Sequence, residues 1–176
     1  MAEIKALSQT LGQQLLRLGW TVTTAESCTG GGISAAITDI AGSSNYFNCA
    51  FVIYSNEAKS ALVEVSPTTL AECGAVSQQV VEQMAAGAAR KAGANMAIAV
   101  SGVAGPGGGT TQKPVGTVWI AIYIDSLSYS DNTSGQGKPT VWHGCFQFDG
   151  DRSQVRQQTV KAALTKALAL LKEKNS

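Results

Sequence analysis

The chain has 176 residues, 44% of them hydrophobic, which is enough to bury a core without disulfides or a structural metal. Thirteen Lys and Arg balance twelve Asp and Glu, and this net charge of +1 argues against a nucleic-acid partner. Only 14% of the residues are charged, against about 25% in an average globular protein, so we expect a homo-oligomer that covers part of the surface.

The first twenty residues form an amphipathic pattern that carries Glu3 and Lys5. They lack the basic, apolar and small-residue regions of a signal peptide. No stretch of the sequence approaches the ~20 uninterrupted apolar residues that cross a bilayer. We therefore expect a cytoplasmic protein with no membrane partner.

Helix and strand patterns alternate along the first half of the chain. Apolar residues recur at helical spacing over 4–18, and this pattern ends near Gly19. A strand and a glycine-rich turn then lead into a second helix, which a buried strand follows; in chain order these are strand 21–25, turn 26–32, helix 33–40 and strand 50–54. Ser55 is the expected N-cap of a third helix.

The second half of the chain continues the alternation. Ser66-Pro67 predicts an N-cap followed by proline at the first helical position, and Ser77 is expected to cap a longer helix that ends near Lys91. The elements that follow are strand 96–100, strand 115–124, strand 140–148 and a final helix that opens at 149–151. The polar segment 126–138 is expected to be a mobile loop between the last two strands.

Interleaved helices and strands predict an α/β fold with helices on both faces of a mostly parallel sheet. The loop before the last strand is too polar to be a crossover helix, so we expect the last two strands to be antiparallel and the sheet to be mixed. No repeat or second domain is visible, and residues 1–176 are expected to form one domain. Both glycine-rich turns follow strands, where ligands bind in open α/β sheets.

The first glycine-rich turn contains a candidate nucleophile, Ser27. A hydroxyl there can face a cleft, and the free N–H groups of the first helical turn can stabilise an oxyanion or a phosphate. Helix capping by Ser27 and Thr29 explains the same pattern equally well. Cys28 is a rival nucleophile, because a helix N-terminus lowers the pKa of a thiol; a side chain packed in the core is the simpler interpretation.

A serine nucleophile needs a base, and the sequence offers two candidates. His143 lies in the middle of a strand pattern, where a structural or surface role is expected. Lys59 is the alternative, although an ordinary lysine, with a pKa near ~10.4, stays protonated at neutral pH. Desolvation or the positive end of a helix would have to lower that pKa. Tyr54, at the end of the strand that precedes Lys59, is a candidate to hydrogen-bond with either Ser27 or Lys59. A solvated surface charge also explains Lys59.

The second glycine-rich turn, 105–114, lets backbone N–H groups approach anionic oxygens without a Cβ in the way. It does not match the Walker A pattern, and a flexible loop explains it as well. Arg152 and Arg156 lie one turn apart at the start of the last helix, where cations oppose the helix dipole. They therefore indicate an anion site or, more simply, a surface pair.

No metal or cofactor site is predicted. The sequence has one histidine, and its cysteines form no C-x-x-C pair: Cys28, Cys49, Cys73 and Cys145. We expect the last three of these cysteines to be small buried hydrophobic residues.

Several motifs occur together in a fixed order: Thr24-Ala25-Glu26-Ser27-Cys28-Thr29-Gly30-Gly31, Tyr54-Ser55-Asn56-Glu57-Ala58-Lys59, Ser101-Gly102-Val103-Ala104-Gly105-Pro106, Lys113-Pro114-Val115-Gly116-Thr117-Val118 and Gly150-Asp151-Arg152. As a set they resemble the CinA C-terminal domain family over essentially the whole chain. No single motif among them is specific.

The resemblance implies a three-layer α/β/α sandwich with a mixed, mostly parallel five-stranded sheet. It also implies a stand-alone amidohydrolase that deamidates nicotinamide mononucleotide to nicotinic acid mononucleotide and ammonia in pyridine nucleotide (NAD) recycling, with no cofactor and no metal. A non-catalytic module that binds a nucleotide or phosphate is the alternative, and a cysteine hydrolase that uses Cys28 is a third.

The resemblance further implies a serine–lysine dyad of Ser27 and Lys59, assisted by Tyr54. Backbone N–H groups at 29–31 are expected to hold the oxyanion, and Ser43 is a further candidate at the site. The expected substrate-binding residues are Thr29, Gly30, Gly31, Ser44, Ser101, Gly102, Gly105, Thr110 and Arg152.

Overall fold

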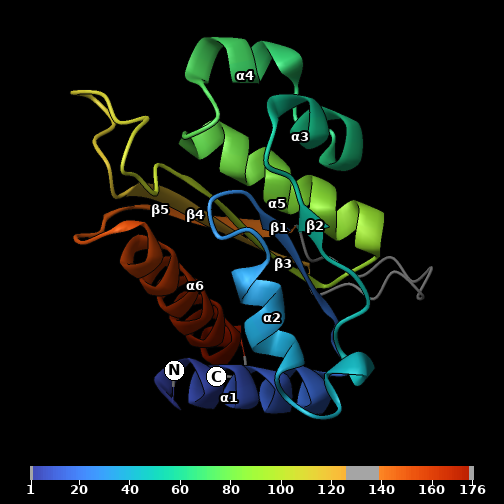
Figure 1. Cartoon of the computed structure of the whole chain (residues 1–176). Coiled ribbons are helices and arrows are strands. Elements are labelled where there is room, and N and C mark those ends of the chain that lie inside the picture. Colours follow the sequence, from blue (N-terminus) through green and yellow to red (C-terminus); the bar gives the residue numbers. More distant parts are fainter. Residues whose placement is uncertain (1, 126–138, 175–176) are drawn as a thin grey trace.

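The computed structural model describes residues 2–125 and 139–174, and it is built in three layers (Figure 1). Helices α1 (Ala2–Leu18), α2 (Gly32–Thr38) and α6 (Arg152–Lys174) cover one face of the sheet. Helices α3 (Asn56–Val63), α4 (Pro67–Cys73) and α5 (Gln78–Ala92) lie on the other side. The predicted α/β/α arrangement is confirmed, whereas the expected loop at 126–138 lies outside the described residues.

The described residues form a five-stranded mixed sheet in the order β2-β1-β3-β4-β5. Its strands are β1 (Val22–Glu26), β2 (Phe51–Val52), β3 (Met96–Gly102), β4 (Thr117–Ile124) and β5 (Thr140–Gln147). Strands β2, β1 and β3 are parallel, and β4 is antiparallel to both of its neighbours. The predicted antiparallel pairing of the last two strands is confirmed. Because β5 runs in the same direction as β3, the carboxyl ends of β1, β2, β3 and β5 share one end of the sheet.

Strand β3 separates the two apolar layers of the core. Met96, Ile98 and Val100 pack towards α1, α2 and α6, whereas Ala97 and Ala99 pack towards α5. Side chains alternate between the faces of a strand, so this sequence gives one large-residue face and one small-residue face. The small face lets α5 approach the sheet closely. Helices α3 and α4 in turn pack against α5.

Two of the three predicted serine caps form as expected. Ser55 and Ser77 each accept a hydrogen bond from the backbone N–H three residues further on, at 3.1 and 3.4 Å. Ser66 precedes α4 but makes no such side-chain bond. The first of these caps fixes the start of α3, the helix that carries Lys59.

The strand predicted over 50–54 is shorter and more exposed than expected. Only Phe51–Val52 pair with β1, and they form the edge of the sheet. The side chains of Val52 and Tyr54 are 53% and 61% exposed. A continuous apolar run is typical of a strand with neighbours on both sides, but local sequence does not report the place of a strand in the sheet.

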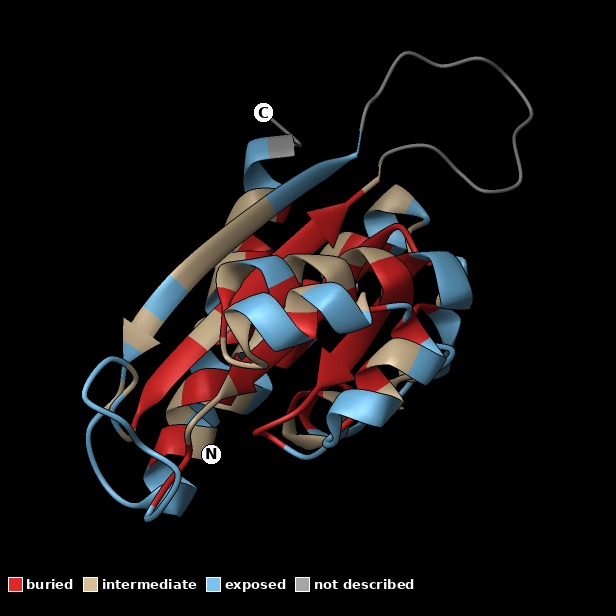
Figure 2. Ribbon diagram, turned by 90° about the horizontal axis from the view of Figure 1, so that it is seen from above, coloured by how far each residue is buried: buried red, intermediate tan, exposed pale blue. Residues whose placement is uncertain are grey.

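The expectation of buried cysteines is wrong for Cys49 and Cys145, which are exposed, while Cys73 is half-buried. Cys145 lies on the edge strand β5, which Figure 2 shows as exposed or intermediate over its length. Solvent reaches an edge strand more readily than a central one, and this accounts for the difference at Cys145. None of the helices in residues 2–125 and 139–174 is long and apolar enough to cross a membrane.

Candidate active site

Ser27 and Lys59 meet beyond the carboxyl end of β1. The Ser27 N–H donates to the Val100 carbonyl of β3 at 3.1 Å, and the Ser27 carbonyl accepts from the Gly30 N–H at 3.0 Å. These bonds fix the residue at the end of its strand. From α3, the Lys59 Nζ donates to the Ser27 Oγ at 3.3 Å. The structure therefore brings together the two side chains of the expected dyad.

Lys59 is almost completely buried, with 1% of its surface exposed. Its side chain turns back towards the start of α3, where Nζ donates to the carbonyls of Ile53 at 3.1 Å and Tyr54 at 3.0 Å. A third carbonyl, that of Ser55, lies at 3.5 Å. No carboxylate in the described part of the chain forms an ion pair with it. The amine is thus surrounded by hydrogen-bond acceptors without a counter-charge.

Burial lowers the pKa of Lys59, because a low-dielectric environment disfavours the ammonium form. The nearby Cys28 and Glu57 act in the opposite direction, with smaller effects on this pKa. A neutral amine has two N–H donors and one lone pair. In that form the two nearer carbonyls match the donors, and the direction of the 3.3 Å contact with Ser27 reverses: the hydroxyl donates to the amine lone pair, as a general base requires.

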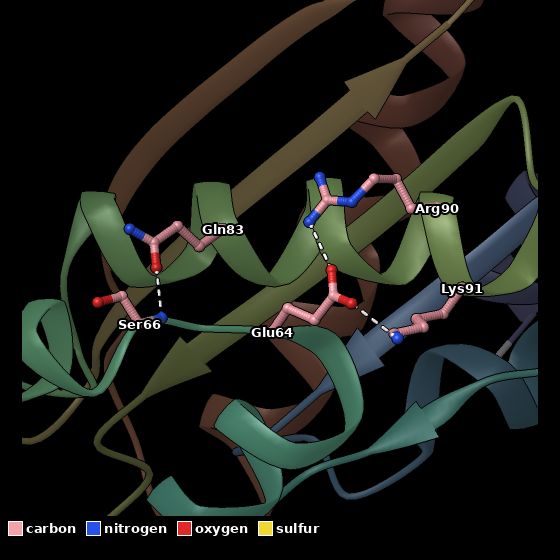
Figure 3. A network of polar contacts seen from close by, with 5 residues as sticks. All are labelled: Glu64, Ser66, Gln83, Arg90 and Lys91. Atoms are coloured by element: carbon pink, nitrogen blue, oxygen red, sulfur yellow. Dashed lines mark hydrogen bonds and ion pairs between the residues drawn. The ribbon is translucent and has the colours of Figure 1, made fainter.

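The C-terminal end of α3 is joined to α5 by polar contacts (Figure 3). Glu64, the C-cap of α3, forms ion pairs with Arg90 at 3.0 Å and Lys91 at 2.7 Å, and the Ser66 N–H donates to Gln83 Oε1 at 2.8 Å. Half-exposed ion pairs of this kind are screened by water and contribute little stability. The position of α3 therefore depends mainly on packing.

That packing is closest at Gly87 of α5. A Cβ at this position would lie 1.8 Å from the carbonyl oxygen of Val63 and 2.7 Å from its carbonyl carbon. Any side chain there would collide with the main chain of α3. The absence of a side chain at Gly87 therefore allows the close contact between α5 and α3, the helix that carries Lys59.

The turn after Ser27 is held by Glu26, whose side chain is completely buried. Its Oε2 accepts hydrogen bonds from the Thr29 hydroxyl at 2.6 Å and the Ile33 N–H at 2.9 Å, and its Oε1 accepts from the Ser34 N–H at 2.8 Å. The first-turn N–H groups of α2 at Ile33 and Ser34 are therefore not free to bind an anion.

This arrangement corrects part of the expected oxyanion site. The Gly30 N–H is also used, because it donates to the Ser27 carbonyl. Within the described residues, the N–H groups of Cys28, Thr29 and Gly31 donate to no backbone acceptor. Donors for an oxyanion thus remain in the turn itself rather than in the helix.

Arg152 joins two parts of the site rim. Its Nη2 donates to the Tyr54 hydroxyl at 2.9 Å, and its Nη1 donates to the Gly105 carbonyl at 2.8 Å. One helical turn later, the Nη2 of Arg156 donates to the Thr29 carbonyl at 2.8 Å. Both arginines therefore contact the segments that surround Ser27 and are more than a surface pair.

Of the other expected binding residues, Ser101 and Gly102 lie at the carboxyl end of β3, next to the strand that precedes Ser27. Thr110 lies on the exposed second turn, where its hydroxyl accepts from the Lys113 N–H at 3.0 Å. The Thr110 hydroxyl is therefore hydrogen-bonded within its own turn. The second turn is connected to Arg152 by the Gly105 carbonyl, which accepts from the arginine Nη1.

The structure does not bring Ser44 to Ser27. Ser44 lies in the short helix η1 (Ser43–Asn45) after α2, together with Ser43. Immediately after η1, the Tyr46 carbonyl accepts from the N–H of Val22, the first residue of β1, at 2.8 Å. Ser44 is therefore near the amino end of β1, whereas Ser27 follows its carboxyl end.

Neither Cys28 nor His143 is among the hydrogen-bond partners of the Lys59 Nζ in the described residues. Burial raises the pKa of the Cys28 thiol to about 12, and this side chain packs in the apolar core. Since the thiolate is the nucleophilic form, Cys28 is a poor nucleophile at neutral pH. His143 lies on β5, with Nδ1 2.7 Å from Glu82 Oε1 of α5, which agrees with the structural role expected for it.

The chain matches the model of the CinA C-terminal domain over residues 4–171. It is 48% identical over 163 residues to nicotinamide-nucleotide amidohydrolase PncC of Shigella flexneri, covering 93% of this chain and 92% of that protein. The protein of the same name from Pseudomonas putida is 48% identical over 170 residues, covering 97% and 98%. The crystal structure of competence/damage inducible protein CihA from Agrobacterium tumefaciens aligns with a TM-score of 0.87 and 41% identity over 96% of this chain and 95% of that one. By sequence and by fold, this chain belongs to the CinA C-terminal domain family.

Proposed function

We propose that this chain is an amidohydrolase that converts nicotinamide mononucleotide to nicotinic acid mononucleotide and ammonia in pyridine nucleotide recycling, through a dyad of Ser27 and Lys59. The observation that carries the proposal is a buried lysine whose Nζ lies 3.3 Å from a serine hydroxyl and that forms no ion pair within residues 2–125 and 139–174. Two relatives that share 48% of their residues with this chain are named nicotinamide-nucleotide amidohydrolase, which supports the choice of substrate.

In the first half of the reaction, neutral Lys59 removes the hydroxyl proton of Ser27 while Oγ forms a bond to the carboxamide carbon. The N–H groups of Cys28, Thr29 and Gly31, which donate to no backbone acceptor in the described residues, are the donors for the oxyanion. The protonated Lys59 then gives its proton to the nitrogen as the carbon–nitrogen bond breaks, and ammonia leaves. An ester between Ser27 and the nicotinoyl group remains.

In the second half, Lys59 takes a proton from a water molecule whose oxygen attacks the ester carbonyl. The bond to the Ser27 Oγ breaks, and Lys59 returns the proton to this oxygen. The carboxylic acid that forms releases its remaining proton to solvent and leaves as the carboxylate, and both side chains recover their starting states. The same amine thus serves as base and acid in each half.

We assign the remaining groups by their chemistry. Ser101, Gly102 and the 29–31 turn surround the reacting amide, while Arg152, Tyr54 and the second turn at Gly105 and Thr110 face the negatively charged phosphate. An arginine that already donates to neutral oxygen atoms can redirect its donors to a phosphate. Ser44 has no part in this assignment within one copy of the chain.

The proposal is tested by incubating the purified protein with nicotinamide mononucleotide in the presence of EDTA. Ammonia and nicotinic acid mononucleotide are expected in equal amounts, the first measured by a coupled assay and the second by chromatography. A non-catalytic nucleotide-binding module would instead give calorimetric binding of the same nucleotide without ammonia, and this result would contradict the proposal.

The pH dependence of kcat/KM is expected to report the lowered pKa of Lys59. The ammonium form has no lone pair, so activity is lost as the pH falls through this pKa and is gained as the pH rises. Because burial lowers the pKa, the midpoint of the rise lies below the ordinary lysine value of ~10.4. Rates of ammonia release from about pH 5 to about pH 10 check this. A rate that is still far from its plateau at about pH 10 would indicate a midpoint at the ordinary lysine value and would show that Lys59 is not the base.

A further inference from the structure

We infer that Glu26 is a positioning residue of the proposed site: its carboxylate holds the turn at 27–31 so that the Ser27 hydroxyl stays within reach of Lys59. The inference rests on the proposed function. Glu26 contacts neither member of the dyad through its side chain in the hydrogen bonds of the described residues, and it acts through the backbone that connects it to Ser27.

The carboxylate of Glu26 is surrounded by donors. Besides the bonds from Thr29, Ile33 and the Ser34 N–H, Oε1 accepts from the Thr24 hydroxyl at 3.1 Å and from the Ser34 hydroxyl. The side chain is 0% exposed, and no lysine, arginine or histidine in the described part of the chain pairs with it. A buried carboxylate is costly unless its oxygens are hydrogen-bonded, and here neutral donors meet both oxygens.

These bonds tie three consecutive segments together. Glu26 is the last residue of β1, Thr29 is in the middle of the turn, and Ile33 and Ser34 are in the first turn of α2. Ser27 lies between two of the tied points. A change in these bonds would therefore move its hydroxyl relative to Lys59, which is held independently by α3.

The turn at 27–31 needs hydrogen bonds from side chains outside it, because its glycine-rich backbone is intrinsically flexible. Gly30 and Gly31 have φ angles of 58° and 94°, in the left-handed region that glycine adopts readily. Two adjacent glycines leave many backbone conformations open unless other groups restrict them. The Glu26 carboxylate supplies this restriction on one side, and Arg156, at the Thr29 carbonyl, supplies it on the other.

The geometry requires a carboxylate and not simply a polar side chain of this size. Each oxygen of Glu26 accepts a backbone N–H, one from Ile33 and one from Ser34. A glutamine has one acceptor oxygen and one NH₂ donor. In either orientation, the NH₂ group would face a backbone N–H, so Glu26→Gln breaks one tie although it conserves volume.

The test compares Glu26→Gln with Glu64→Gln, the same change at the half-exposed carboxylate shown in Figure 3. Glu26→Gln is expected to lower kcat by about 100-fold with KM nearly unchanged, because a displacement near 1 Å has an effect of this size. The pH midpoint is expected to stay in place, since the surroundings of Lys59 are intact. Glu64→Gln is expected to retain the wild-type kcat. A folded Glu26→Gln variant with wild-type kcat and only a lower melting temperature would overturn the inference.

Ser34→Ala keeps the inference testable if Glu26→Gln does not fold. It removes one hydroxyl donor from Oε1 and leaves every backbone tie in place. We expect a folded protein with kcat lowered by about threefold at unchanged KM, the effect of one ordinary hydrogen bond. An unchanged kcat in this variant would overturn the inference as well.

Labelling of Ser27 by a fluorophosphonate, followed by mass spectrometry, separates this inference from the proposed function. In this reaction, Oγ bonds to phosphorus and fluoride leaves, so the rate reports the serine hydroxyl whatever the natural substrate is. If the wild type is neither labelled nor active on nicotinamide mononucleotide, the proposed function fails. If the wild type is labelled and Glu26→Gln is labelled equally fast, only the inference about Glu26 fails.

Discussion

Replacing Lys59 by methionine is expected to lower kcat for ammonia release by about 1,000-fold, within the range of a lost general base. Methionine is unbranched and apolar, so it fits the buried volume that Lys59 occupies but offers no lone pair to the Ser27 hydroxyl. Steady-state ammonia release measures the effect, and circular dichroism shows whether the fold is retained. Lys91→Met, at a half-exposed lysine of α5, is the matched control and is expected to keep the wild-type rate.

A companion change, Ser27→Ala, defines whether the two side chains act as a unit. It is expected to abolish turnover, and the double variant is expected to be no less active than Ser27→Ala alone, because neither member of a dyad works without the other. Multiplicative losses in the double variant would contradict a shared role. So would substantial ammonia release by a folded Ser27→Ala protein.

Gly87→Ala is expected to lower the free energy of unfolding by about 3 kcal/mol, the upper part of the usual range for overpacking. The added Cβ would meet main-chain atoms of Val63, 1.8 and 2.7 Å away, and rotation of a side chain cannot relieve this contact. Either α3 or α5 must move. Urea unfolding measures the loss, and kcat is expected to fall with it because α3 carries Lys59.

Gly107→Ala is the control for this change in stability. A Cβ at Gly107 meets nothing within 4 Å, so its free energy of unfolding is expected to match that of the wild type. A Gly87→Ala protein that unfolded at the wild-type urea concentration and kept its kcat would show that the α3–α5 contact does not position Lys59.

The sequence predicts the layers of this fold well, because periodicity, caps and glycines act locally. The helix over 4–18 and the strand over 96–100 differ from α1 and β3 by no more than two residues at either end. The burial of a residue is harder to predict, because it depends on neighbours that are distant in the sequence. Val52 lies within the apolar run 50–54, yet it is at the edge of the sheet, because strand order is set by tertiary contacts that no short window of sequence contains.

In the candidate site, too, features that depend on contacts between distant segments are not visible in the local sequence. Lys59 resembles any surface lysine in its own segment: residue chemistry offers it only as one of two candidate bases, and the resemblance of several distant motifs to one family selects it as the partner of Ser27. The sequence shows Glu26 only as a member of a motif and predicts no role for it, because most of its donors lie three to eight residues further on and are reached only when the turn folds back. Gly87 lies inside the helix predicted from Ser77 to near Lys91, and nothing in its local sequence shows that the main chain of another helix contacts it.

Ser44 is an expectation that topology alone could have corrected. A helix that follows a parallel strand returns the chain to the amino end of the sheet before the next strand begins. Residues after α2 therefore lie far from the carboxyl end of β1, where Ser27 is. Arg152 differs because it directly follows β5, which ends on the same side as β1.

The reversed direction of β4 makes the last helix part of the site. Since β4 returns the chain to the far end of the sheet, β5 leads back to the Ser27 end, and α6 then contributes Arg152 and Arg156, which are 98 and 127 residues from their partners Tyr54 and Thr29. During synthesis, Ser27 and Lys59 emerge long before either arginine. The proposed site is therefore complete only after the C-terminal helix has docked, and because α6 also supplies buried core residues such as Leu164 and Leu171, clipping within it is expected to remove core packing together with both arginines.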